Sequence, residues 1–119
     1  MVKARRLYHI NLNVSDIERA VSFYQQAFGL VENFRQGPRM VFLSPPGGDD
    51  VITLHQTDPV GPQGVAHFGF EIEDGNLDDA VAAVVKAGGK FLSQGAHAPG
   101  VPFAYVQDPD GYVIELSPA

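Results

Sequence analysis

The chain carries the same pattern of residues twice, at an offset of about sixty positions. Residues 51–54 read Val-Ile-Thr-Leu and residues 113–116 read Val-Ile-Glu-Leu, so Thr53 stands where Glu115 stands. His9 and His67 occupy matching places near the start of each copy. An internal repeat of this kind predicts two copies of one supersecondary unit, and we expect them to be related by a pseudo-twofold axis.

Each copy begins with a strand and a helix. Residues 7–14 and 65–73 alternate between apolar and polar positions, which is typical of half-buried strands, and each strand carries its histidine on the polar face. Ser15 and Glu18 form a capping box before an apolar stripe that stops at Gly29. Asn76 is the expected N-cap of the second helix.

Short strands follow each helix. We expect them at residues 30–35, 39–44 and 51–55, and again at 91–93, 102–107 and 112–117, with residues 94–100 as a loop containing His97. Each copy is therefore βαβββ and the fold class is α+β. We expect one domain over residues 1–119, with a first module at about 1–57, a Pro- and Gly-rich linker at about 58–64 and a second module at about 65–119.

Charge and composition narrow the possible partners. The formal net charge is −6 and the pI is about 4.9, which argues against binding nucleic acid or an anionic membrane surface through bulk charge. No apolar run is long enough to span a bilayer, and no signal-peptide core follows the basic start, so a cytoplasmic location is expected. Because the chain has no Cys, any metal must be held by His, carboxylate or hydroxyl groups.

Glu115 is the residue that most needs a partner. It lies between Ile114 and Leu116 on an expected strand, and an ionised carboxylate in such a run must be paired, hydrogen-bonded or bound to a metal. The repeat places His9 and His67 at equivalent positions on the sheet faces that the helices leave open. Two His and one carboxylate suit a divalent metal such as Fe²⁺, Mn²⁺, Ni²⁺ or Zn²⁺, with open positions for substrate oxygens. The alternative is a metal-free cup lined by polar residues.

Other side chains are candidates for roles beside this site. His55 shares the face of Thr53, and Tyr105 is either a core residue or a phenol donor next to the metal. We treat His55 and Tyr105 as candidates for moving a proton. His97 is expected in solvent, or as part of a lid. The candidate substrate contacts are Asn11, Thr53 and Phe103.

These motifs together resemble the vicinal oxygen chelate superfamily, also called the glyoxalase, bleomycin resistance protein and dioxygenase family. The resemblance rests on the strand around His9, the helix with Phe23-Tyr24 and Phe28-Gly29-Leu30, the strand at His67, and Asp-Pro-Asp-Gly before Glu115. It implies paired βαβββ modules that form an incomplete barrel around a divalent metal. Carried over by position, the metal ligands are His9, His67 and Glu115.

The resemblance also implies a function. Members bind a small substrate through two adjacent oxygens, and Thr53 departs from glyoxalase I, which has a carboxylate there. That departure favours dioxygenase-like or lyase- or transferase-like chemistry, and Tyr105 matches a tyrosine near the metal in those branches. The alternative is a metal-free, drug-sequestering protein of the bleomycin resistance type. Family members suggest a homodimer, with which the apolar residues Phe34, Phe42 and Phe103 are compatible.

Overall fold

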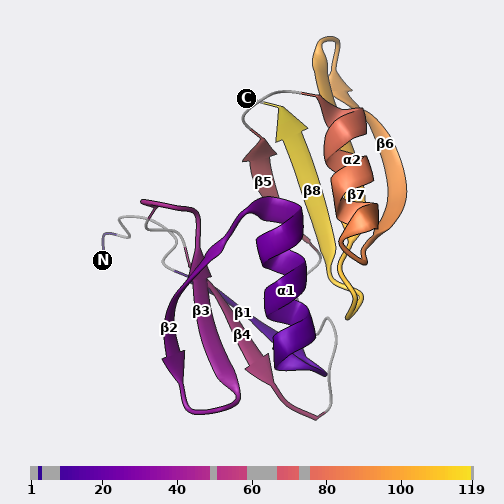
Figure 1. Ribbon diagram of the computed structural model, residues 1–119. Coiled ribbons are helices and arrows are strands. Elements are labelled where there is room, and N and C mark those ends of the chain that lie inside the picture. The colour runs from indigo at the N-terminus through magenta and orange to yellow at the C-terminus, as the bar shows by residue number, and fades with distance from the viewer. Residues whose placement is uncertain (1–2, 4–8, 49–50, 59–66, 73–75, 119) are drawn as a thin grey trace. The chain divides into compact units, whose positions relative to one another are not determined.

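The computed structural model describes residues 3, 9–48, 51–58, 67–72 and 76–118. Its internal contacts fall into two compact units, Met1–Val60 and Gly61–Ala119. Each unit holds a four-stranded sheet and one helix among its described residues. Figure 1 labels these elements along the chain. The predicted α+β class and the two βαβββ modules are confirmed.

The first unit follows the expected order of elements. It consists of β1 (His9–Val14), α1 (Ile17–Phe28), β2 (Val31–Gln36), β3 (Met40–Ser44) and β4 (Val51–Gln56). The sheet order is β1-β4-β3-β2, with β1 and β4 parallel and the other pairs antiparallel. A parallel pair needs a crossover connection, and the chain between β1 and β4 supplies it.

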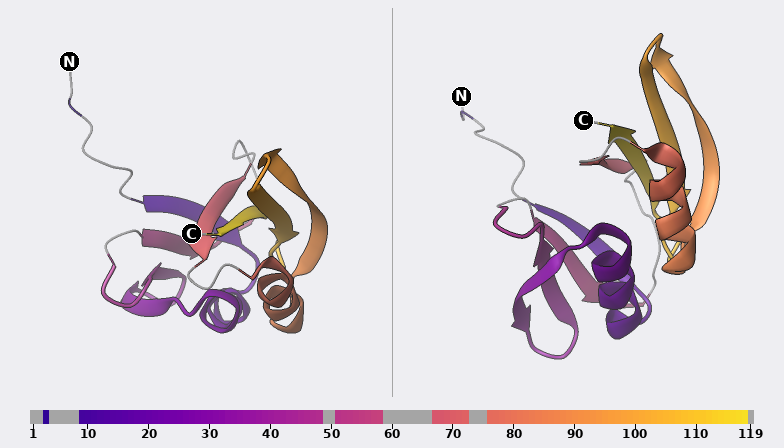
Figure 2. Two further views of the ribbon diagram at one scale, coloured as in Figure 1. Left: turned by 90° about the horizontal axis from the view of Figure 1, so that it is seen from above. Right: turned by 45° about the horizontal axis from the view of Figure 1, so that its top comes forward.

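The second unit repeats this arrangement. Its elements are β5 (Phe68–Ile72), α2 (Leu77–Lys86), β6 (Lys90–Ala98), β7 (Val101–Gln107) and β8 (Val113–Pro118). The sheet order is β5-β8-β7-β6, and again only the first pair is parallel. Two views in Figure 2 show each helix against one face of its own sheet.

Alternating burial shows which sheet face each helix covers. In the first unit α1 contacts β3 and β4, and the side chains of Val41, Leu43 and Leu54 are fully buried. In the second unit α2 contacts β6, β7 and β8, and Val106, Ile114 and Leu116 are fully buried. Because successive strand residues point to opposite faces, the residues between these positions lie on the face away from the helix. We call this the open face of each sheet.

The ends of the helices agree with the sequence in part. Asn76 caps α2 as predicted, since its side chain accepts a hydrogen bond from the Asp79 N–H at 3.1 Å, and Gly29 ends α1 with a φ of +67°. The predicted Ser15 cap is wrong. Asp16 caps α1 through the Arg19 N–H at 3.1 Å, and the Arg19 guanidinium donates to the Ser15 hydroxyl instead. Ser and Asp are both favoured N-cap residues, and α1 begins one residue later than expected.

The strand β6 is the main departure from the sequence-based expectation. The predicted strand at 91–93 and loop at 94–100 are replaced by one strand, Lys90–Ala98, which contains His97. It pairs with β7 from Lys90 to Ala98, with register shifts after Phe91 and Ala96. Gly, Ala and Ser are weak strand formers alone, but pairing with β7 satisfies their backbone groups. The predicted linker at 58–64 lies mostly outside the described residues, as do residues 7–8, 65–66 and 73 of the predicted first strands.

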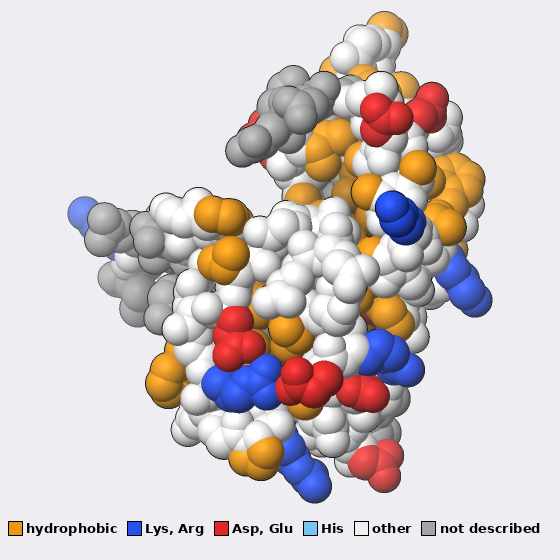
Figure 3. All heavy atoms as spheres, viewed as in Figure 1, with side chains coloured by type: hydrophobic (Ala, Val, Ile, Leu, Met, Phe, Trp, Pro, Cys, Tyr) orange, Lys and Arg blue, Asp and Glu red, His pale blue; other side chains and the backbone are white. Residues whose placement is uncertain are grey.

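A surface ion-pair network joins the first helix to the edge of its sheet. Arg35 on β2 bonds to Glu32 at 2.9 Å and to Glu18 on α1 at 2.5 Å. Acidic and basic side chains also lie side by side on the surface of the first unit seen in Figure 3. Among the described residues, no helix is long and apolar enough to cross a membrane.

Candidate metal centre

The strand registers place the repeated residues at equivalent positions in the two sheets. Thr53 pairs with Asn11 on β1 and with Phe42 on β3. Glu115 pairs with Gly69 on β5 and with Tyr105 on β7. Thr53 and Glu115 are therefore structural mates, as the repeat predicts.

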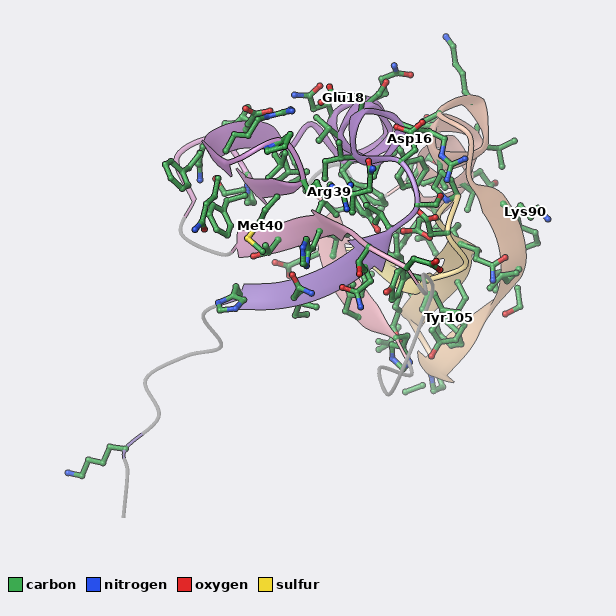
Figure 4. The ribbon with its side chains drawn as sticks, turned by 90° about the horizontal axis from the view of Figure 1, so that it is seen from below. Asp16, Glu18, Arg39, Met40, Lys90 and Tyr105 are labelled. Carbon is green, nitrogen blue, oxygen red and sulfur yellow. The ribbon has the colours of Figure 1, made fainter. Side chains whose placement is uncertain are left out.

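The second unit brings several predicted site residues together on its open face. The Nε2 atom of His67 lies 3.7 Å from Oε1 of Glu115, and the rings of His67 and Tyr105 meet edge to face at 5.2 Å. Figure 4 labels Tyr105, whose side chain projects from the sheet of the second unit. Phe103 is the third ring in this series of contacts, with its ring centroid 5.0 Å from that of Tyr105, so the three rings form a row. His67 itself lies directly before β5, because the strand begins at Phe68.

Glu115 has polar neighbours as well as the imidazole. The Ser117 hydroxyl donates a hydrogen bond to Oε2 of Glu115 at 3.0 Å. Tyr105 also donates a side-chain hydrogen bond to this carboxylate. The pKa of Tyr105 is raised above its usual value, first by partial removal of the phenol from water, then by this hydrogen bond and by the charge of Glu115. Tyr105 therefore keeps its proton at neutral pH and acts as a donor.

The first unit carries the remaining predicted residues on its own open face. The side chains of His9 and Asn11 are exposed, and Asn11 donates to Asn13 at 3.2 Å. His55 is half-buried and pairs with Asn13 and Met40 in the register of the sheet. Thr53, by contrast, is only 4% exposed.

These residues divide between the two units. His9, Asn11, Thr53 and His55 belong to the first, whereas His67, Phe103, Tyr105 and Glu115 belong to the second. Within the described part of the chain, no three His, Asp or Glu side chains gather closely enough to hold a metal ion. The assignment of His9 as the third ligand stays a prediction, while the second unit by itself pairs His67 with Glu115.

The pair in the second unit fits a divalent metal. Two donor atoms bound to one ion at about 2.1 Å each lie about 3.0–3.5 Å apart at right-angled to tetrahedral geometry. The 3.7 Å between His67 and Glu115 needs only a small movement of either side chain to reach that range. An imidazole nitrogen and a carboxylate oxygen also match the ligand preferences of Fe²⁺, Mn²⁺, Ni²⁺ and Zn²⁺.

Two residues at this site were not predicted from the sequence. Ser117 follows Glu115 by two positions, so it shares a strand face with it, and this spacing was the available signal. Gly69 lies between Phe68 and Phe70 within a strand, and a glycine inside a strand is a sign of close backbone approach. A Cβ atom at position 69 would lie 3.0 Å from the backbone oxygen of Glu115.

Comparison with known proteins identifies the family. A family model described as the Glyoxalase/Bleomycin resistance protein/Dioxygenase superfamily matches residues 6–116. The chain belongs to this superfamily. The resemblance seen in the sequence is thereby confirmed.

Relatives within the superfamily differ in activity. The chain is 27% identical over 122 residues to a lactoylglutathione lyase of Haemophilus influenzae, covering 93% of this chain and 90% of that protein. It is 31% identical over 137 residues to the mitochondrial methylmalonyl-CoA epimerase of Mus musculus, covering 98% and 75%. The chain spans only 44% and 35% of the length of two plant relatives that it also matches.

Solved structures share the fold. A variant of the fosfomycin resistance protein FosX from Listeria monocytogenes, in complex with Mn(II) and a dihydroxypropylphosphonic acid, has a TM-score of 0.80 at 22% identity. The match covers 97% of this chain and 90% of that one. At this identity the likeness concerns the fold alone.

Proposed function

We propose that this protein is a metal-dependent enzyme that binds a small substrate through two adjacent oxygens, with dioxygenase-like or lyase- or transferase-like chemistry. The observation that carries the proposal is the cluster of His67, Tyr105 and Glu115 on the open face of the second unit. His67 and Glu115 would hold the metal. His9, the repeat mate of His67, would supply the third ligand, either from the same chain or from a second copy.

Each site residue has a separate task in this proposal. A bound divalent ion would act as a Lewis acid that stabilises negative charge on a substrate oxygen. Tyr105 would donate a hydrogen bond or a proton, since a phenol is protonated at neutral pH and the charge of Glu115 opposes its ionisation. His55 is the candidate base, and Asn11, Thr53 and Phe103 are the candidate substrate contacts.

A second candidate function is drug sequestration without metal, as in the bleomycin resistance branch. The observation that favours it is the row of rings formed by His67, Tyr105 and Phe103, with centroids 5.2 and 5.0 Å apart. Edge-to-face rings of this kind also form a surface on which a flat aromatic ligand can pack. Metal content distinguishes the two functions.

The test uses protein purified without oxygen. The metal content of the wild type is measured beside His67→Ala and beside His97→Ala, a histidine that the proposal leaves outside the site. We expect the wild type and His97→Ala to carry stoichiometric metal and His67→Ala to lose it. If the wild type lacks metal and gains none on dialysis with Fe²⁺, Mn²⁺, Ni²⁺ or Zn²⁺, the enzyme proposal is wrong. Tight binding of an aromatic drug by that metal-free protein would then favour sequestration.

A further inference from the structure

The two oxygens of the Glu115 carboxylate have different neighbours. Oε1 lies toward His67, 3.7 Å from its Nε2 atom, whereas Oε2 accepts the hydrogen bond from the Ser117 hydroxyl at 3.0 Å. Ser117 is two residues further along β8 and therefore on the same face of the strand. The Ser117 hydroxyl thus bonds to one carboxylate oxygen while the other lies beside the imidazole.

The strand beside Glu115 leaves little room for a side chain at position 69. Gly69 is the β5 residue paired with Glu115, and a Cβ atom there would lie 3.2 Å from the Glu115 Cβ and 3.0 Å from its backbone oxygen. Contacts of 3.0–3.4 Å are tighter than nearly all real Cβ contacts. A Cβ atom at position 69 would therefore push Glu115 or β5 aside by a few tenths of an ångström.

We propose that Ser117 is a positioning residue for Glu115 and that Gly69 provides the space in which it does so. By engaging Oε2, the hydroxyl orients the carboxylate so that Oε1 is presented beside His67. This inference rests on the proposed function, in which Glu115 is a metal ligand. Hydrogen bonds to ligating carboxylates orient them and raise metal affinity.

The physical gain is preorganisation. A glutamate side chain has three rotatable torsions, and ordering them at the moment of metal binding costs conformational entropy. The Ser117 hydroxyl and the close approach of β5 restrict these torsions before the metal arrives. Loss of either feature should weaken metal binding without removing a ligand.

The test measures Mn²⁺ affinity of the metal-stripped protein from the electron paramagnetic resonance signal of free Mn²⁺. Ser117→Ala should weaken binding about 10-fold, within the range typical of lost outer-shell partners, while Ser117→Thr keeps the hydroxyl and should retain the affinity. Gly69→Ala should weaken binding as well. The matched control is Ser93→Ala, which removes a hydroxyl from β6 at the position paired with Tyr105.

Thermal unfolding without metal separates positioning from folding. Ser117→Ala should unfold at nearly the wild-type temperature, because its half-buried side chain loses only a hydroxyl. If Ser117→Ala binds Mn²⁺ as tightly as the wild type while His67→Ala loses it, the positioning role is wrong and the proposed function stands. If the wild type binds no metal, the proposed function fails and this inference fails with it.

Discussion

Tyr105 and Glu115 are paired directly across the antiparallel strands β7 and β8, and the phenol donates a hydrogen bond to the carboxylate. Glu115 thereby has Tyr105, His67 and Ser117 as neighbours on one sheet face. The equivalent pair in the first unit is Phe42 and Thr53, which has neither a carboxylate nor a phenol. The two units therefore share a sheet order and strand pairing, but only the second carries ionisable side chains at this pair of positions.

The Tyr105 pKa should respond to the charge of Glu115. We expect Glu115→Gln to lower the pKa of Tyr105 in metal-free protein, because the amide carries no charge to oppose the phenolate. Part of the elevation should remain, since partial removal from water is the largest cause. Absorbance titration of the phenolate measures this, with Tyr105→Phe identifying the signal among the four tyrosines. Glu71→Gln is the control, and identical curves for Glu115→Gln and the wild type would contradict the coupling.

Thr53→Glu tests whether the repeat mate of Glu115 faces the same metal. Thr53 is 4% exposed, so a carboxylate there should be desolvated and should lower the unfolding temperature of the metal-free protein. Bound metal would gain a fourth protein ligand, and we expect Mn²⁺ to raise the unfolding temperature of Thr53→Glu more than that of the wild type. Thr53→Gln supplies nearly the same shape without charge. Equal responses of the Glu and Gln variants to metal would show that position 53 does not reach the ion.

Leu54, the residue after Thr53, should affect the stability of the fold and not the binding of metal. Leu54 is fully buried on the helix side of the sheet, and Leu54→Ala should reduce the free energy of unfolding by about 2–5 kcal/mol through lost burial and a residual cavity. Urea denaturation of the metal-free protein measures this. The folded fraction should still bind metal, because Leu54 lies on the opposite face from Thr53. A decrease in the free energy of unfolding below about 1 kcal/mol would mean that neighbouring side chains fill the space left by the removed Leu54 atoms.

The Arg35 network should contribute a small pH dependence of stability. The hydrogen bond from Arg35 lowers the pKa of Glu32 below its usual 4.5, with burial opposing and the charge of Arg35 assisting. Because the folded pKa lies below the unfolded one, the stabilisation is present above about pH 4.5 and is lost as the pH falls through the folded value.

Glu32→Gln should therefore flatten the fall in stability on acidification below this pH, as measured by urea denaturation across the range. The side chains of Glu32 and Arg35 are about one third exposed, at 34% and 33%, so the effect should be small and should shrink with added salt. Lys90→Gln, which changes a charge in the other unit, is the control. A Glu32→Gln variant with the wild-type acid dependence would contradict a role for this pair.

Much of the fold was predictable because its signals are local. Alternation along residues 9–14, the Asn76 cap and the positive φ at Gly29 all depend on residues a few positions apart. The repeat then predicted that His9 and His67, like Thr53 and Glu115, would be equivalent, and the registers bear this out for Thr53 and Glu115. Errors arose at the cap of α1, where Ser15 and Asp16 are both favoured residues, and in β6, whose weak strand formers are held by pairing with the next strand, β7.

The sequence alone determined the element types, the two-fold repeat and the chemistry of the candidate donors, since periodicity and residue type are properties of short segments. Only the tertiary structure decided which of those donors meet. The contact of His67 with Glu115, and the close approach of Gly69 to the same residue, join segments more than forty positions apart through the register of β5 on β8. No local pattern encodes that register, because it is selected by burying Ile114 and Leu116 beneath α2 and so turning Glu115 to the open face.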